Sequence, residues 1–486
     1  MGRAVPPLQV DDIQGIVLFG YGRLRYACFL LVGVTEPAAA RTWLSTLDVR
    51  NAVFNPDEVD RCLNIAFTSE GLKRLGLDDE LLRELALEFR EGMAGTEHRR
   101  RILGDVDESA PDSWRWGGPR NAEPHMLLML YGRDEGALSA LLSEHLSRFT
   151  RAGLQLIEKL DTNWLPHEKE HFGFRDGVSQ TGIEGLHTTT APANTVAPGE
   201  FVLGYLNAYG QYTHRPLVNP ERDPGGLLPQ AADDPSRRDL GLNGSYLVFR
   251  QLSQDVDRFW RFCDEQARRG GDCGRADAHV RLAAKMVGRW PSGAPLVKSP
   301  DADNPVLGND NDFLYYGSDD KHGFKCPIGS HIRRTNPRDS LEPNPGSERS
   351  IEVGKRHRIL RRGRTYGAPV ADTMEIADIL AAGEAHGDRG LHFICFNTHI
   401  GRQFEFIQHT WVNNPGFDGL YEDDDPLVGD RGGARGRPAG TFTIQSEPIR
   451  TRVTGMPRFV HVRGGGYFFM PGIRAIRFLA ALRGSR

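Results

Sequence analysis

Asp176 is the first of three side chains in this sequence that could carry chemistry. It lies in the segment 173–177, whose sequence is GFRDG. Glycines on both sides of an acid allow backbone conformations closed to other residues and a close approach to a flat ligand, so this segment could hold a carboxylate in a confined pocket. An Asp-Gly pair is also common in surface turns, and the motif alone favours a turn. Two later segments favour the pocket instead.

His331 and Arg361 lie in those later segments. A lone histidine is more often an ordinary polar residue than a ligand, but Arg333 and Arg334 follow His331 closely. Guanidinium groups bind carboxylates bidentately, and haem combines two carboxylates with an iron that a neutral imidazole commonly holds. His331 is therefore a candidate haem ligand and Arg334 a candidate partner for the carboxylates. The basic run around Arg361, taken alone, is typical of a solvated face.

The strands and helices that would position these residues follow one another in the same order twice along the chain. In the first part, apolar strand-like runs alternate with amphipathic stretches in the order strand, helix, strand, strand, helix, strand, which is the ferredoxin-like pattern. A second, less regular copy follows. We expect strands at 25–34, 62–68, 125–131, 153–160, 245–252, 391–396 and 467–470, and helices around 42–44 and at 70–77, 135–148, 255–268, 402–411 and 473–482. This rhythm predicts an α+β fold with an N-terminal domain at 1–190 and a C-terminal domain at 191–486.

Composition excludes several classes of function. The 486 residues carry 60 basic and 64 acidic side chains, a formal charge of -4, so no overall basic field attracts nucleic acid or an anionic membrane. The longest apolar runs are of strand length, and the start of the chain shows no secretory signal. The six cysteines are scattered without a CxxC pair, and Cys28 and Cys395 lie in apolar runs typical of a core. We therefore expect a cytoplasmic protein.

Taken together, the segments resemble the dye-decolorising (DyP-type) haem peroxidases. Residues 173–177 are similar to the GxxDG motif of that family, 330–338 to its proximal-histidine segment, and 359–367 to its distal-arginine segment. The resemblance extends in the expected order over nearly the whole chain, and the long loops resemble the large subgroup that includes the fungal enzymes. One small departure is Thr181, where the family usually has proline. The further matching segments are 12–17, 243–252, 402–408 and 463–471.

The resemblance implies a cofactor and roles for the three side chains. Family members enclose haem between duplicated ferredoxin-like domains of the dimeric α+β barrel superfamily, so one haem b per chain is expected. By resemblance His331 would be the iron ligand. Asp176 would take the proton from peroxide and return it to the leaving oxygen, and Arg361 would stabilise the developing charge.

For the remaining candidate residues, the sequence leaves two interpretations open. Leu391 and Phe393 suit the apolar walls of the distal pocket and suit a core equally well. The carboxylate behind the proximal histidine is expected after the 402–411 helix, with Asp418 as first choice and Glu422 as second. Tyr366 is expected at the surface, as a relay that passes electrons from the haem to bulky dyes, although simple packing explains this tyrosine equally well.

The expected activity is oxidation of dyes and of phenolic or other aromatic donors by hydrogen peroxide. A haem-handling or haem-iron-releasing protein of the same fold, with weak peroxidase activity, is the main alternative. A chlorite-decomposing enzyme on the related fold and a structural or cargo-binding protein without cofactor are two others. The sequence leaves open the physiological electron donor and whether the chain is a monomer or a dimer.

Overall fold

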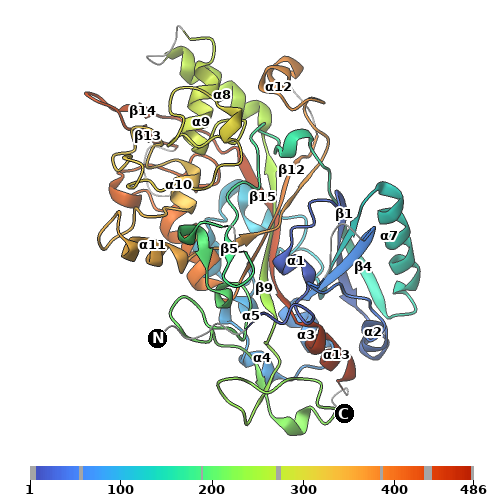
Figure 1. Cartoon of the computed structure of the whole chain (residues 1–486). Helices are drawn as coiled ribbons and strands as arrows, with labels where there is room; N and C mark the ends of the chain where they lie inside the picture. The colour runs from blue at the N-terminus through green and yellow to red at the C-terminus, as the bar shows by residue number, and fades with distance from the viewer. Residues whose placement is uncertain are drawn as a thin grey trace.

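A long antiparallel sheet runs through the molecule (Figure 1). The computed structural model describes residues 7–53, 59–187, 190–269, 275–383, 387–431 and 440–482. The sheet has nine strands in the order β10-β12-β9-β15-β2-β3-β1-β4, and β11 also pairs with β12. The strands are β1 (Tyr26–Val34), β2 (Arg61–Phe67), β3 (Met126–Gly132), β4 (Leu154–Asp161), β9 (Ser245–Gln254), β10 (Leu360–Arg361), β11 (Arg364–Tyr366), β12 (Gly390–Asn397) and β15 (Val460–Met470).

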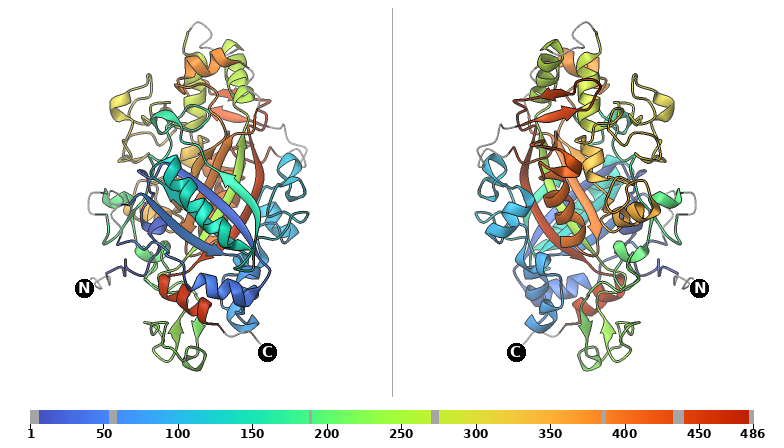
Figure 2. Two further views of the ribbon diagram at one scale, coloured as in Figure 1. Left: turned by 90° about the vertical axis from the view of Figure 1, so that its right-hand side faces the viewer. Right: turned by 90° about the vertical axis from the view of Figure 1, so that its left-hand side faces the viewer.

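The N-terminal strands form one ferredoxin-like unit. The chain runs β1, α2 (Pro37–Leu44), β2, β3, α7 (Glu135–Phe149), β4, and the strands lie in the order β2-β3-β1-β4 with every neighbouring pair antiparallel. Figure 2 shows α7 crossing the face of these strands. The expected strand, helix, strand, strand, helix, strand pattern is confirmed here.

The C-terminal strands repeat this arrangement. Their order, β15-β9-β12 followed by β10 and β11, matches that of the first unit when β9 is taken as its first strand. The two units meet where β15 pairs with β2, with Phe469 opposite Phe67. The ferredoxin-like α+β class is thus confirmed, whereas the domain boundary near residue 190 stays a prediction.

The expected 402–411 helix is present in an unusual form. It is a pair of π-helical segments, Gly401–Glu405 and Ile407–Val412, and a typical hydrogen bond joins the Glu405 amide to the Ile400 carbonyl at 3.0 Å. π-Helical turns are rare in proteins as a whole, but those that occur are often found at functional sites. Ile407 and Gln408 indeed line the cavity described below.

The two faces of the sheet are covered differently because strand side chains alternate. Leu30, Leu128 and Val248 enter a core with α2, α7 and the terminal helix α13 (Ile473–Ala481), whereas Phe29 and Phe249 enter a second core. Cys28 and Cys395 are fully buried, as expected for core residues. The remaining helices are α1 (Gly15–Leu18), α3 (Ser69–Arg74), α4 (Asp79–Arg83), α5 (Leu87–Glu91), α6 (Glu97–Leu103), α8 (Val256–Arg269), α9 (Ala278–Val287), α10 (His331–Thr335), α11 (Glu348–Lys355) and α12 (Ile376–Ala382).

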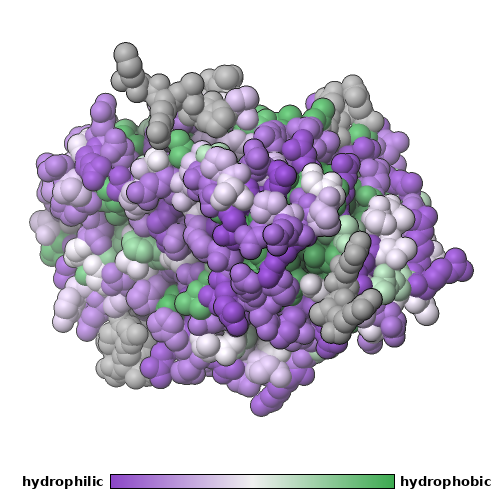
Figure 3. All heavy atoms as spheres, turned by 90° about the horizontal axis from the view of Figure 1, so that it is seen from below, coloured by the Kyte–Doolittle hydropathy of each residue, from purple (hydrophilic) through white to green (hydrophobic). Residues whose placement is uncertain are grey.

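The helices α8, α9 and α10 lie on the side of the molecule away from α2 and α7 (Figure 1). The face seen from below is mainly hydrophilic, and its hydrophobic side chains are scattered in small areas (Figure 3). Within the described ranges, no helix has both the length and the apolar character that crossing a membrane requires.

Candidate active site

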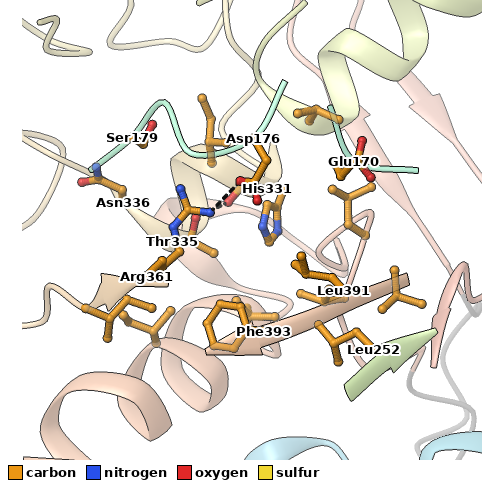
Figure 4. A pocket seen from close by; sticks show the side chains of 18 of the residues that line it. Glu170, Asp176, Ser179, Leu252, His331, Thr335, Asn336, Arg361, Leu391 and Phe393 are labelled. Carbon is orange, nitrogen blue, oxygen red and sulfur yellow. Dashed lines mark hydrogen bonds and ion pairs between the residues drawn. The ribbon is translucent and has the colours of Figure 1, made fainter. Parts of the chain in front are cut away.

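One cavity brings together the three segments singled out in the sequence. Asp176 comes from the loop after residue 170, His331 begins α10, and Arg361 ends β10. All three side chains point into the cavity (Figure 4). Since they are far apart in the chain, their meeting is a product of the tertiary fold.

His331 is oriented by a buried carboxylate. Its Nδ1 lies 3.0 Å from Oδ2 and 3.2 Å from Oδ1 of Asp425. Burial opposes the charge on Asp425, but the nearby His331 and Arg334 outweigh it and lower the pKa of Asp425 to about 2. An ionised carboxylate accepts a hydrogen bond from Nδ1–H, so the proton stays on Nδ1 and Nε2 is the nitrogen available to ligate iron.

The partner of His331 is therefore neither Asp418 nor Glu422, and that prediction was wrong. Asp418 lies in a tight turn at φ 47°, and Glu422 pairs with Arg452 at 3.5 Å. Asp425 is turned inward because its Oδ1 accepts the backbone N–H groups of residues 427 and 428, at 3.0 and 2.9 Å. The run of three aspartates at 423–425 was the available signal, but only the turn decides which one faces the histidine.

Arg334 has a different role from the one predicted. It does not line the cavity; its guanidinium donates to four backbone carbonyls, those of residues 329, 411, 414 and 423, at 2.8–3.2 Å. These bonds tie α10 to the segment that carries Asp425. Arg334 thus supports the histidine site from behind and does not contact a cofactor in the cavity.

Asp176 and Arg361 form a second pair in the same cavity. Arg361 Nη1 donates to Asp176 Oδ1 at 3.1 Å, and the two side chains remain 31% and 38% exposed to the cavity and solvent. The amide of Gly177 donates to the same Oδ1 at 2.7 Å. Oδ2 has no hydrogen-bond partner among the described residues, so it is the oxygen available to a ligand. Gly177 itself adopts φ 78°, which favours glycine.

Leu391 and Phe393 line the cavity from β12. Leu391 lies opposite Leu252 of β9, and both point toward the same space (Figure 4). Because side chains alternate along the strand, the intervening His392 faces the other side of the sheet, where it contacts Phe29 and Phe249. Leu391 and Phe393 both line the cavity, and Phe393 also packs against the core.

Tyr366 is not at the surface, and the expectation of a solvent-facing relay is wrong. Its side chain is 6% exposed, its hydroxyl lies 3.3 Å from Asp388, and its ring stacks on His392 with centroids 4.6 Å apart. Burial raises the pKa of this phenol well above its ordinary value. The short strand β11, which pairs with β12, carries Tyr366.

Buried arginines at one end of the cavity were missed from the sequence. Arg338 is fully engaged by Asn311 and by the Phe313 carbonyl, but Nε of both Arg289 and Arg358 is buried without a partner among the described residues. Burial and the charge of Arg338 lower the pKa of Arg358 to about 9. A buried, uncompensated cation is costly, so this end of the cavity fits an anionic ligand.

The donor set fits haem. The imidazole, with one nitrogen held by a carboxylate, suits the iron, and the apolar walls suit the faces of the porphyrin. The buried guanidinium groups of Arg289 and Arg358, whose Nε atoms have no partner among the described residues, suit the haem carboxylates. Within the described residues, no cluster of three or more His, Cys, Asp or Glu suggests a metal site of another kind.

Comparisons with known proteins agree with this chemistry. No protein-family model matches the chain. The chain is 30% identical to a dye-decolorizing peroxidase of Exidia glandulosa, over 97% of this chain and 87% of the relative. Identity and coverage are the same for dye-decolorizing peroxidase AauDyP1 of Auricularia auricula-judae. A solved dye-decolorizing peroxidase in complex with 2,6-dimethoxyphenol superimposes with a TM-score of 0.77 at 27% identity, covering 98% of this chain and 100% of that one.

Proposed function

This chain belongs to the dye-decolorizing peroxidase family, and we propose that it is a haem peroxidase that uses hydrogen peroxide to oxidise dyes and phenolic or other aromatic donors. One observation carries the proposal: the paired side chains of Asp176 and Arg361 line the same cavity as His331, which the buried Asp425 holds through Nδ1. The first pair is suited to proton transfer on peroxide and the second to holding iron.

His331 would ligate the haem iron through Nε2, and Arg358 and Arg289 would bind the haem carboxylates. Haem, when bound, supplies the redox chemistry that cleaves the O–O bond. Asp425 keeps the proton of His331 on Nδ1 and increases the basicity of the ligating nitrogen. Leu391 and Phe393 keep water from the reacting atoms, which strengthens the electrostatic interactions between them.

Asp176 and Arg361 act on peroxide itself. Asp176 Oδ2, which has no hydrogen-bond partner among the residues that the structure describes, takes the proton from one peroxide oxygen and returns it to the other as that oxygen leaves. Arg361 stabilises the negative charge that develops during the transfer and holds Asp176 in place through Oδ1. A carboxylate serves as base only when it is ionised, so this chemistry tolerates an acidic medium better than a histidine base would.

The test is rapid mixing of haem-loaded protein with peroxide in the absence of a donor. Asp176→Asn should slow the spectral change by about 10²–10⁴-fold, since a positioned proton-transfer group contributes that much. Arg361→Leu should slow the same step by removing charge stabilisation, and both variants should keep their haem. Wild-type rates in both variants would contradict the proposed mechanism.

A further inference from the structure

A second carboxyl group lies in the cavity, and the chemistry described above does not use it. Glu170 lines the cavity together with Asp176, and Figure 4 shows Asp176 between Arg361 and Glu170. The two acids belong to one loop but have different surroundings. Asp176 is paired with an arginine, whereas Glu170 forms no ion pair with any described residue.

Neutral groups surround Glu170. Its Oε2 accepts the Phe172 amide at 3.0 Å and contacts Gln254 at 2.6 Å, and its Oε1 accepts the Phe174 amide at 2.9 Å. These hydrogen bonds lower the pKa of Glu170, but burial outweighs them and the pKa is raised to about 7. The charge of Asp176 contributes to this rise. The carboxyl group therefore carries a proton in weakly acidic solution.

The contact with Gln254 suits a protonated carboxyl. Gln254 Nε2 donates to Glu170 Oε2 at 2.6 Å. Oε1 of Gln254 has no partner as the amide is oriented, and the two ends of an amide exchange by rotation. Protonated Glu170 can thus donate to the amide oxygen, and ionised Glu170 can accept from the amide nitrogen. The pair accommodates both protonation states.

The charged groups around Glu170, Asp176 included, are engaged with partners other than Glu170. The adjacent His171 is neutral, because burial lowers its pKa to about 4, and Trp260 of α8 donates to the Phe172 carbonyl. Among the residues that the structure describes, no cation forms an ion pair that would hold Glu170 ionised. The engaged pairs are Lys169 with Glu375, Arg250 with Asp105, Arg458 with Asp430, and Arg361 with Asp176.

Peroxide reduction creates a need for such a group. The overall half-reaction, H2O2 + 2 e⁻ + 2 H⁺ → 2 H2O, consumes two protons beyond the one that Asp176 moves between the peroxide oxygens. A hydroquinone delivers protons with its electrons, but ferrocyanide delivers electrons alone. With ferrocyanide, both protons must reach the reacting oxygens from solvent, directly or by way of an acid in the cavity.

We propose that Glu170 is the proton-delivering acid of the cavity, which supplies the protons that accompany electrons from donors that carry none. This inference rests on the proposed peroxidase function. In each delivery the O–H bond of Glu170 breaks, the proton goes to the oxygen being reduced to water, and Glu170 is reprotonated from solvent. Ferrocyanide is the species oxidised and peroxide the species reduced.

The experiment compares the two donors in haem-loaded wild-type protein and Glu170→Gln. Ferrocyanide oxidation at pH 6 should fall about 10²-fold in the variant, whereas hydroquinone oxidation should stay within about threefold. Wild-type ferrocyanide oxidation should decline as the pH rises through about 7, where Glu170 loses its proton, and the variant should lack this step. Glu170→Asp, which keeps an acid, should recover part of the ferrocyanide activity. Asp372→Asn, which removes an exposed carboxyl that does not line the cavity, is the control and should behave as wild type.

Two further measurements distinguish proton delivery by Glu170 from a purely structural role of this residue. If Glu170 only holds the turn before Asp176, Glu170→Gln will slow the donor-free reaction with peroxide and both donors equally, which would overturn the proposal. Equal ferrocyanide activity in variant and wild type would also overturn it. In haem-free protein, the infrared band of a protonated carboxylic acid should disappear through pH 7 in the wild type and be missing in Glu170→Gln; its absence from the wild type at pH 6 would count against the assignment. A wild type that does not react with peroxide would instead refute the proposed function.

Discussion

Arg358 and Arg334 are both buried arginines, yet their guanidinium groups differ in what they contact. Arg334 donates to four backbone carbonyls, so its burial is compensated. Arg358 Nε is buried beside the cavity with no partner among the described residues. One arginine stabilises the protein itself, and the other stabilises a ligand at the expense of the ligand-free protein.

Substitution of Arg358 should therefore separate haem affinity from stability. Arg358→Met should weaken haem binding about 10–100-fold, because a charge-assisted hydrogen bond contributes about 1.5–3 kcal/mol. The same change should leave the free energy of unfolding of the haem-free protein unchanged or higher, since it removes an uncompensated buried charge. Haem titration and chemical denaturation measure the two quantities.

Arg334→Met is the matched control. It should lower the free energy of unfolding of the haem-free protein, because four carbonyls lose their donor. Haem affinity in Arg358→Met equal to that of the wild type would show that this arginine does not bind the carboxylates.

The residue types of the site were more predictable than its supporting contacts. Asp176, His331 and Arg361 stand in motifs, and the fold brings them to one cavity. Asp425 was missed because three adjacent aspartates look alike until a turn directs one inward. Arg334 was misassigned because proximity in sequence to His331 does not tell which way a side chain points.

At the scale of elements, the loop from Glu170 to Gly177 is the one that positions Asp176. Glu170 accepts the amides of Phe172 and Phe174, and the Asp176 amide donates to the Glu168 carbonyl at 2.9 Å. These bonds close the turn, and Gly177 continues it at φ 78° with open space where a Cβ would lie. The loop is thus fixed by hydrogen bonds on one side of Asp176 and by backbone conformation on the other.

Gly177→Ala should test the conformational part of this account. The space admits a methyl group, so the cost is backbone strain of about 1–2 kcal/mol in the free energy of unfolding. A shift that relieves this strain moves Asp176, so the reaction with peroxide should slow as well. Denaturation and rapid mixing measure the two effects.

Gly210→Ala provides the comparison, because Gly210 adopts φ 71° with equally open surroundings but does not line the cavity. It should lose similar stability and keep the wild-type rate with peroxide. Equal peroxide rates in Gly177→Ala and wild type would mean that this glycine does not position Asp176.

The strands were predictable because apolar runs such as 25–34 are bounded by polar segments, and β1 indeed spans Tyr26–Val34. The 402–411 helix was predicted, but its π-helical geometry was not, since apolar spacing does not report the hydrogen-bond pattern. Tyr366 was placed at the surface by its position after a basic run. Pairing of β11 with β12 and stacking on His392 instead bury it.

At the scale of the whole molecule, two ferredoxin-like units form one sheet, and loops and helices of both parts of the chain complete one cavity. The Asp176 loop follows the first unit, and the His331 helix lies between strands of the second. No single unit contains both faces of the site. The duplicated rhythm of the sequence predicted the units, but their shared sheet required the pairing of β2 with β15.

The most direct test of this arrangement is the haem content and ferric absorption spectrum of His331→Ala. If His331 holds the iron and Asp425 orients it, the variant should retain little haem or show an altered spectrum, and added imidazole should restore the wild-type spectrum. Asp425→Asn should keep the haem but change the spectrum, because the ligating nitrogen becomes less basic. Haem content and a ferric spectrum identical to the wild type in His331→Ala would contradict the account.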